Sequence, residues 1–301
     1  MIELLIQVSI DKMEVSPSLK STEYGNYSYE WIPCCFDSFL KELYHIKGVG
    51  SSAEHLLIYR GHKDRRWLLD STFIRYVKEN ILGVSAISKV RPDYRESLEF
   101  HRLLGCLFLY KFGTHTGPHQ ELVDLAQEHP IDPWFEWMKI IQQYPYKDLG
   151  PMRGSFLVDW TQNEKVALYF ANENRHRHSE GAIWIADVNA MGKVFHRDKP
   201  VIEILRLFQD ALKNDIPVGC PLVFYPQKQI ANQRAKNQEA IYVAQMDLRF
   251  DLAEIWSHME LESQENEKIF IKLVLPSGTS AKCDDWLLAQ NIDENFIYPD
   301  K

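Results

Sequence analysis

The chain has 301 residues, of which 45% are hydrophobic and 25% charged, and its 42 acidic and 34 basic residues give a net charge of −8. This mixture is typical of a globular protein and excludes a disordered tail, a collagen-like repeat and a coiled coil. The acidic balance argues against a wholesale cationic nucleic-acid binder, although it permits one local basic cleft.

Cysteine usage and the absence of export signals indicate a cytoplasmic protein. The five cysteines are an odd number without a CxxC pair, which favours free thiols over a disulfide framework. The first residues, MIELLIQVSIDKMEV, have no basic segment before their apolar run and no small-residue cleavage site, so no signal peptide is expected. No uninterrupted apolar run approaches the roughly 18 residues of a membrane span, so no membrane partner is expected.

The N-terminal part of the chain is predicted to contain strands, a loop and a helix, and the middle is predicted to be helical. We expect a strand and a polar, Ser/Tyr-rich loop over residues 1–35, and a buried strand in the short apolar run 55–60, which stops at Gly61. Apolar residues at helical spacing predict helices over 36–46, 94–112 and 132–144, and a Pro/Gly-containing connection follows at 145–154.

The second half of the chain is predicted to be richer in strands. Short apolar runs predict strands at 155–160, 182–188, 221–226, 240–246 and 268–275. Between them we expect helices at 163–174, capped by Asn163, at 200–213, and from a Ser280 cap to Gln290. Helices early and strands late predict an α+β fold with a central mixed or antiparallel sheet. We expect two segments, 1–35 and a domain over 36–301, with a helical insertion at about 75–150.

Several short motifs occur in a distinctive order. The chain contains IYRGH at 58–62, DWTQNEKVALYFAN at 159–172 and RAKNQEAIYV at 234–243. With Trp67-Leu68-Leu69 and Tyr298-Pro299-Asp300, these motifs resemble the FRG domain family, which is named for its Phe/Tyr-Arg-Gly motif. The resemblance covers roughly residues 36–300, and the block 159–171 is its most specific part.

Two stretches depart from the family pattern. The family usually approaches Asp159-Trp160 through His-Tyr-Gly-x-Pro-Thr-Arg-Leu-Leu, whereas this chain has DLGPMRGSFLV at 148–158. The glycine expected in Gln-x-Gly is replaced, because Gln238 is followed by Glu239 and Ala240. The family implies a bacterial or phage-associated protein, and its function has to be inferred from the site itself.

The motif order is also similar, by layout alone, to that of ADP-ribosyltransferases. This similarity implies a nucleotide pocket with NAD as a possible co-substrate and no metal. Arg60 would hold the pyrophosphate through a two-pronged contact, and Gly61 would allow close backbone approach. Glu239, with Gln238, would stabilise the developing charge on the nicotinamide ribose. The remaining residues expected to contact substrate are Tyr59, Asp159, Thr161, Asn163, Tyr169 and Arg234.

Each candidate also has a structural interpretation. Arg60 could pair with a buried Asp159 without any ligand. Asp159 and Thr161 could serve only to start the helix at Asn163, and Glu239 could be a solvated edge charge. Trp160, Tyr169 and Phe170 could be core residues.

Two further clusters suggest little chemistry. His115 and His119 are separated by Gly-Pro and have no obvious third partner, so no metal site is expected. The run RHRH at 175–178 is interpreted as a solvated helix end, with phosphate or RNA contact as the alternative.

Two functions remain open. The first is an ADP-ribosyltransferase or NAD glycohydrolase that would suit a bacterial toxin or a phage-defence effector. The alternative is a module that binds a nucleotide, a nucleic acid or a phage protein without turnover. A purely structural polar network is a third interpretation of the same residues.

Overall fold

The computed structural model describes residues 30–50, 54–76, 155, 157–194, 222–224, 233–245, 251–262 and 269–299. Its strands are β1 (Glu30–Trp31), β2 (Leu57–His62), β3 (Leu157–Thr161), β4 (Gly181–Asp187), β5 (Leu222–Phe224), β6 (Ala240–Ala244) and β7 (Phe270–Leu275). Its helices are α2 (Phe36–Val49), α3 (Thr72–Tyr76), α8 (Glu164–Asn172), α9 (Val188–Val194), α11 (Gln233–Asn237), α12 (Leu252–Glu262), α13 (Ser280–Ala289) and α14 (Glu294–Ile297).

The described strands form one open mixed sheet in the order β1-β7-β4-β2-β3-β6-β5. The β1–β7 pair is parallel, and the other neighbours are antiparallel. The expected α+β class is therefore confirmed. The sheet places β2, which carries the Tyr-Arg-Gly motif, between β4 and β3, which carries the Asp-Trp-Thr motif.

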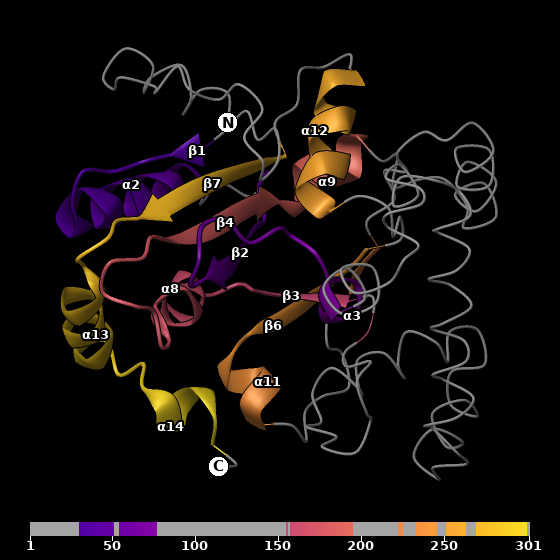
Figure 1. Ribbon diagram of the computed structural model, residues 1–301. Coiled ribbons are helices and arrows are strands. Elements are labelled where there is room, and N and C mark those ends of the chain that lie inside the picture. The colour runs from indigo at the N-terminus through magenta and orange to yellow at the C-terminus, as the bar shows by residue number, and fades with distance from the viewer. Residues whose placement is uncertain are drawn as a thin grey trace, which may run out of the picture.

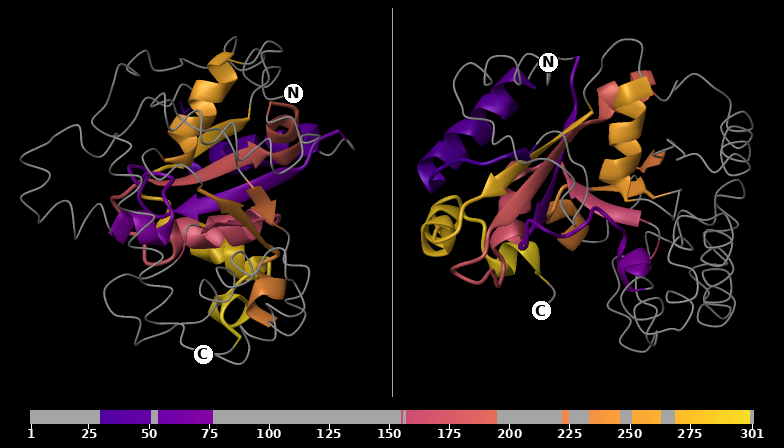
Figure 2. Two further views of the ribbon diagram at one scale, coloured as in Figure 1. Left: turned by 90° about the vertical axis from the view of Figure 1, so that its right-hand side faces the viewer. Right: turned by 45° about the horizontal axis from the view of Figure 1, so that its top comes forward.

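Helices cover both faces of the sheet (Figures 1 and 2). On one face, α2, α8 and α13 enclose a core that contains Phe39, Leu43 and Ile271. On the other face, α12 packs Trp256 against Trp160 and Phe270. Successive side chains of a strand point to opposite faces of the sheet. Because helices cover both faces, β4 is buried along its whole length.

Most expected elements within the described residues are confirmed. The helix capped by Asn163 is α8, in which the Asn163 side chain accepts from the Lys165 amide at 3.0 Å. The cap of α13 was predicted one residue late, because Thr279 occupies that position and its hydroxyl donates to the Pro276 carbonyl. The strand at 182–188 ends at Asp187, whose carboxylate accepts from the Asn189 amide and starts α9.

The short helices α3, α9, α11 and α14 and the longer α12 were not expected. Strand β1 lies in the stretch expected to be a polar loop, and β2 continues to His62 beyond the expected end at Arg60. The expected helices at 94–112, 132–144 and 200–213, the connection at 145–154 and most of the insertion at 75–150 lie outside the described residues, as do His115 and His119. No helix within the described ranges is long and apolar enough to cross a bilayer.

Candidate functional site

The candidate site lies where β2 and β3 separate. The two strands share a single residue pair, Tyr59 with Thr161, in the ladder. Beyond this pair, the Arg60 side chain donates from Nη1 to the backbone carbonyl of Asp159. The Asp159 carboxylate lies farther away, with Oδ2 3.9 Å from Nη1. Arg60 therefore bridges the opening between two strands that backbone hydrogen bonds no longer join.

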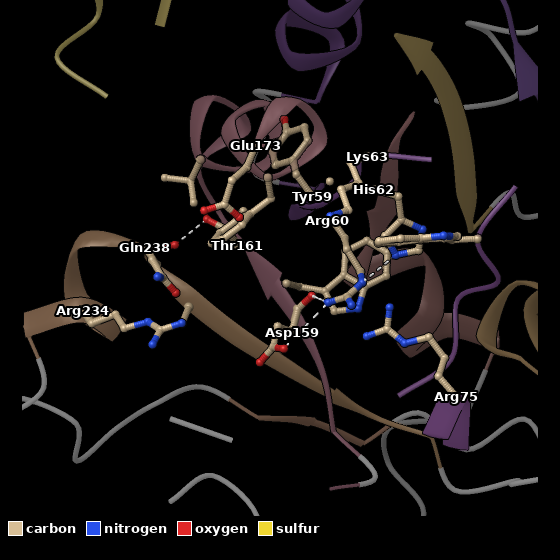
Figure 3. A pocket seen from close by; sticks show the side chains of 16 residues that line it. Tyr59, Arg60, His62, Lys63, Arg75, Asp159, Thr161, Glu173, Arg234 and Gln238 are labelled. Atoms are coloured by element: carbon tan, nitrogen blue, oxygen red, sulfur yellow. Dashed lines mark hydrogen bonds and ion pairs between the residues drawn. The ribbon is translucent and has the colours of Figure 1, made fainter. Parts of the chain in front are cut away.

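A cavity of about 400 Å³ opens at this point (Figure 3). Its walls come from β2 and the loop after it, α3, β3, α8, α11 and the start of β6. Of the residues predicted to form the site, it brings together Tyr59, Arg60, Gly61, Asp159, Thr161, Arg234 and Gln238. Segments that are far apart in the sequence thus converge around the Arg60 guanidinium.

Arg60 is held rigidly and is mostly buried. Its side chain is 12% exposed, and its Nε donates to His62 Nε2 at 3.0 Å. Burial, reinforced by Arg75, lowers the pKa of Arg60 to about 10, against the opposing effect of Asp159. A pKa of about 10 still leaves the guanidinium charged near neutral pH.

His62 is the buried partner behind Arg60. Its pKa is held well below the ordinary histidine value by burial and then by the nearby charges of Arg60, Arg75 and Lys272. His62 is therefore neutral at pH 7. Its Nδ1 lies 3.2 Å from the indole nitrogen of Trp184, so N–H donors face both ring nitrogens.

Charge in the cavity is opposite in sign to that of the whole chain. Four cations line it, Arg60, Lys63, Arg75 and Arg234, against the two carboxylates Asp159 and Glu173. The chain as a whole carries a net charge of −8. The cavity is therefore a local basic cleft of the kind that composition alone left open.

Two of the predicted lining residues also have structural roles. The Thr161 hydroxyl donates to the Gln238 carbonyl at 2.6 Å and accepts from the Asn163 amide at 2.9 Å. Gln238 is 8% exposed, and its side chain donates from Nε2 to the Ile297 carbonyl at 3.0 Å. These bonds tie β3, α11 and the C-terminal segment together behind the cavity.

Three other candidates do not line the cavity. The Glu239 side chain is exposed, and its carboxylate accepts from Asn163 Nδ2 at 2.9 Å. Asn163 itself serves as the N-cap of α8. Tyr169 packs edge-on against Phe170 and Tyr298, and burial together with Glu173 raises the pKa of Tyr169 to about 12.

The expected buried Arg60–Asp159 pair takes a different form. The main contact is to the Asp159 backbone, and the Asp159 side chain is 46% exposed.

The need for glycine at position 61 has a cause that the sequence did not indicate. A Cβ at Gly61 would lie 1.9 Å from the Ala167 carbonyl oxygen of α8. The close approach that requires glycine is therefore between β2 and α8.

The cavity also contains residues that were not predicted to form the site; those with charged, polar or exposed aromatic side chains are His62, Lys63, Trp67, Arg75 and Glu173. His62 could have been found, because a residue two positions from Arg60 on a strand shares its face. Trp67 lies in a recognised motif but was given no role. Arg75 lies in α3, and Glu173 lies at the end of α8. No pattern in the sequence links either residue to Arg60.

The basic run at 175–178 was interpreted wrongly for its first residue. Arg175 is 6% exposed and donates to the carbonyls of Ser179 and Pro276, at 2.8 and 2.9 Å. It also donates to the side chains of Asn172 and Thr279. Arg175 therefore fixes the turn after α8, while the three residues that follow it are exposed.

Comparison with known proteins identifies the region that carries this site. No curated protein and no solved structure matches the chain, so its similarity to ADP-ribosyltransferases stays a prediction. The FRG domain model matches residues 55–180, which contain 13 of the 16 residues lining the cavity. The other three, Arg234, Gln238 and Ala240, come from α11 and β6. The chain thus carries an FRG domain, and the candidate site is built mainly from it.

Proposed function

We propose that the cavity binds a phosphate-bearing nucleotide, with Arg60 at its centre. The observation that carries this proposal is a cavity of about 400 Å³ in which four cations outnumber two carboxylates. Its size is within the range of small-molecule sites. A structural polar network would leave little open volume between its members, so the volume favours a ligand.

The donors of Arg60 support contact with a phosphate. A guanidinium has five N–H groups, and among the described residues two are engaged, with His62 and with the Asp159 carbonyl. The other three, on Nη1 and Nη2, can donate to a ligand. Because two bonds already fix the guanidinium plane, a phosphate would meet donors that are already oriented. Burial also strengthens the charge–charge attraction.

A binding titration with a matched control tests this proposal. We expect ADP to bind the wild-type protein by calorimetry and Arg60→Gln to weaken binding at least tenfold, because a charge-assisted bond contributes about 1.5–3 kcal/mol. Arg66→Gln is the control, since Arg66 is exposed, pairs with Asp64 at 2.6 Å and does not line the cavity. Equal affinities of the two folded variants would refute the proposal.

Cleavage of NAD is the second candidate function, and Glu173 is the observation that favours it. This carboxylate lines the cavity, and its Oε1 accepts from the Tyr298 hydroxyl at 2.8 Å. A carboxylate so fixed could stabilise positive charge on the nicotinamide ribose as the glycosidic bond breaks. Water would then yield ADP-ribose and nicotinamide, or a nucleic-acid or protein acceptor would take the ADP-ribose.

Glu173 takes the role that was expected of Glu239, which lies outside the cavity. Mass spectrometry of the protein incubated with NAD should detect free nicotinamide, and Glu173→Gln should reduce its formation by a factor of about 100 or more. Glu239→Gln is the control and should keep the wild-type rate. Nucleotide binding without nicotinamide release would leave the non-catalytic module as the function. Cleavage of NAD would support a toxin or phage-defence role.

A further inference from the structure

Trp67 occupies an unusual position at the cavity. It lies in the loop between β2 and α3, lines the cavity and is 37% exposed. Its ring meets the edge of His62, with centroids 5.9 Å apart. The other large exposed hydrophobic side chains of the described residues, Ile32, Tyr44 and Leu288, do not line it. Trp67 therefore presents an aromatic ring to whatever occupies the cavity.

Two cations accompany this ring. Lys63 Nζ lies 5.6 Å and the Arg75 guanidinium carbon 5.7 Å from its centroid. Among the described residues, neither cation has a carboxylate within 4 Å; Arg75 donates to the Thr72 hydroxyl at 3.3 Å. Within the part of the chain that the structure describes, both charges thus lie next to an aromatic ring without an acidic partner, in a cavity that also contains Arg60.

An aromatic ring beside cations that no described carboxylate pairs with matches the two parts of a nucleotide. A nucleobase stacks on an indole, and the phosphates attached through the sugar take charge-assisted bonds from lysine and arginine. We propose that Trp67, Lys63 and Arg75 form the subsite that receives the base and its nearest phosphate. This inference rests on the proposed nucleotide function and adds that the nucleobase is the group that the site selects. Lys63, on a flexible stem, exchanges its contact with the indole for one with a phosphate oxygen.

The subsite makes the cavity select nucleotides over simpler phosphates. Stacking on tryptophan corresponds to a factor of about 5 to 150 in affinity. AMP and ribose 5-phosphate differ by the base alone, so their affinity ratio measures this effect. We expect wild-type protein to bind AMP at least about fivefold more tightly than ribose 5-phosphate.

Titrations of these two ligands on Trp67→Leu and Trp67→Phe test the proposal. Trp67→Leu should bring the affinity ratio to within twofold of one while leaving ribose 5-phosphate binding at its wild-type strength. Trp67→Phe, which keeps an aromatic face, should retain most of the ratio. The exposed position of Trp67 makes both variants compatible with folding, which circular dichroism will verify.

The outcomes separate the two levels of the inference. Three results would overturn the base subsite: an unchanged affinity ratio in Trp67→Leu, an equal loss of affinity for both ligands in that variant, or no preference for AMP in the wild type. Those results would leave the phosphate site at Arg60 standing. If neither ligand binds the wild type, or if Arg60→Gln binds both as well as the wild type does, the nucleotide function itself falls, and the base subsite with it.

Discussion

Replacing Gly61 with alanine should destabilise the protein severely. The added Cβ would lie 1.9 Å from the Ala167 carbonyl oxygen, 2.5 Å from the Ala171 amide nitrogen and 3.0 Å from the Ala167 carbonyl carbon. All three atoms belong to the backbone of α8, so no side chain can rotate away. Ordinary carbon–oxygen contacts are roughly 3.2 Å or longer, and β2 would have to separate from α8 by more than about 1 Å.

The magnitude follows from this displacement. Overpacking of a well-packed core costs about 1–3 kcal/mol when side chains can adjust, and more when backbone must move. We therefore expect Gly61→Ala to lower the free energy of unfolding by at least about 3 kcal/mol, a large part of the usual 5–15 kcal/mol of a domain. Urea denaturation followed by circular dichroism measures this loss.

Gly48 provides the matched control. It lies within α2, and a Cβ there would meet nothing within 4 Å. Because glycine in a helix is less favourable than alanine, Gly48→Ala should raise the free energy of unfolding by about 0.5–1 kcal/mol. If Gly61→Ala instead unfolds within about 1 kcal/mol of the wild type and only loses ligand binding, then Gly61 serves the ligand and the close packing of β2 on α8 is refuted.

Three further predictions test individual contacts. The pKa of His62 is lowered in the folded protein, so the unfolded chain binds an extra proton as pH falls below about 6.5. The free energy of unfolding should therefore decline toward pH 5, by up to about 1.4 kcal/mol per pH unit from this group. An equally steep decline in His62→Gln would contradict this. Gln238→Ala removes a buried hydrogen bond to the Ile297 carbonyl, so the free energy of unfolding should fall by about 1 kcal/mol and amide hydrogen exchange at 294–299 should become faster. Unchanged exchange would show that this bond does not hold the C-terminal segment in place. Glu239 has a φ of 44°, a left-handed conformation that glycine adopts more easily. Glu239→Gly should therefore raise the free energy of unfolding, measured by thermal denaturation, by about 1 kcal/mol and leave nucleotide affinity unchanged. Weaker nucleotide binding by this variant would show that Glu239 belongs to the site.

The sheet could be predicted well because hydrophobic pattern and turn residues determine it locally. The apolar runs that became β2, β3, β4, β6 and β7 were each short and bounded, and Asn163 gave a clear start for α8. The helix α12 was missed although Leu252, Ile255 and Trp256 recur at helical spacing and Trp256 belongs to the core on one face of the sheet; this spacing could have predicted the helix.

The candidate site was predictable only in part. The motif order led to the hypothesis of a single pocket around Arg60, but it could not show whether Arg60, Asp159 and Gln238 meet. All three line one cavity. Which groups face the cavity depends on strand register and on the separation of β2 from β3, which sequence spacing does not encode. Glu239 shows this limit: it follows Gln238 directly, yet its left-handed backbone carries its side chain to the surface. Glu173 reaches the cavity from the end of a helix on another segment.

A crystal structure of the protein grown with ADP tests the central claim most directly. We predict phosphate density in the opening between β2 and β3, within hydrogen-bonding distance of the Arg60 N–H groups that have no partner among the described residues. Nucleotide bound at another surface, with the Arg60 cavity unchanged, would contradict the account.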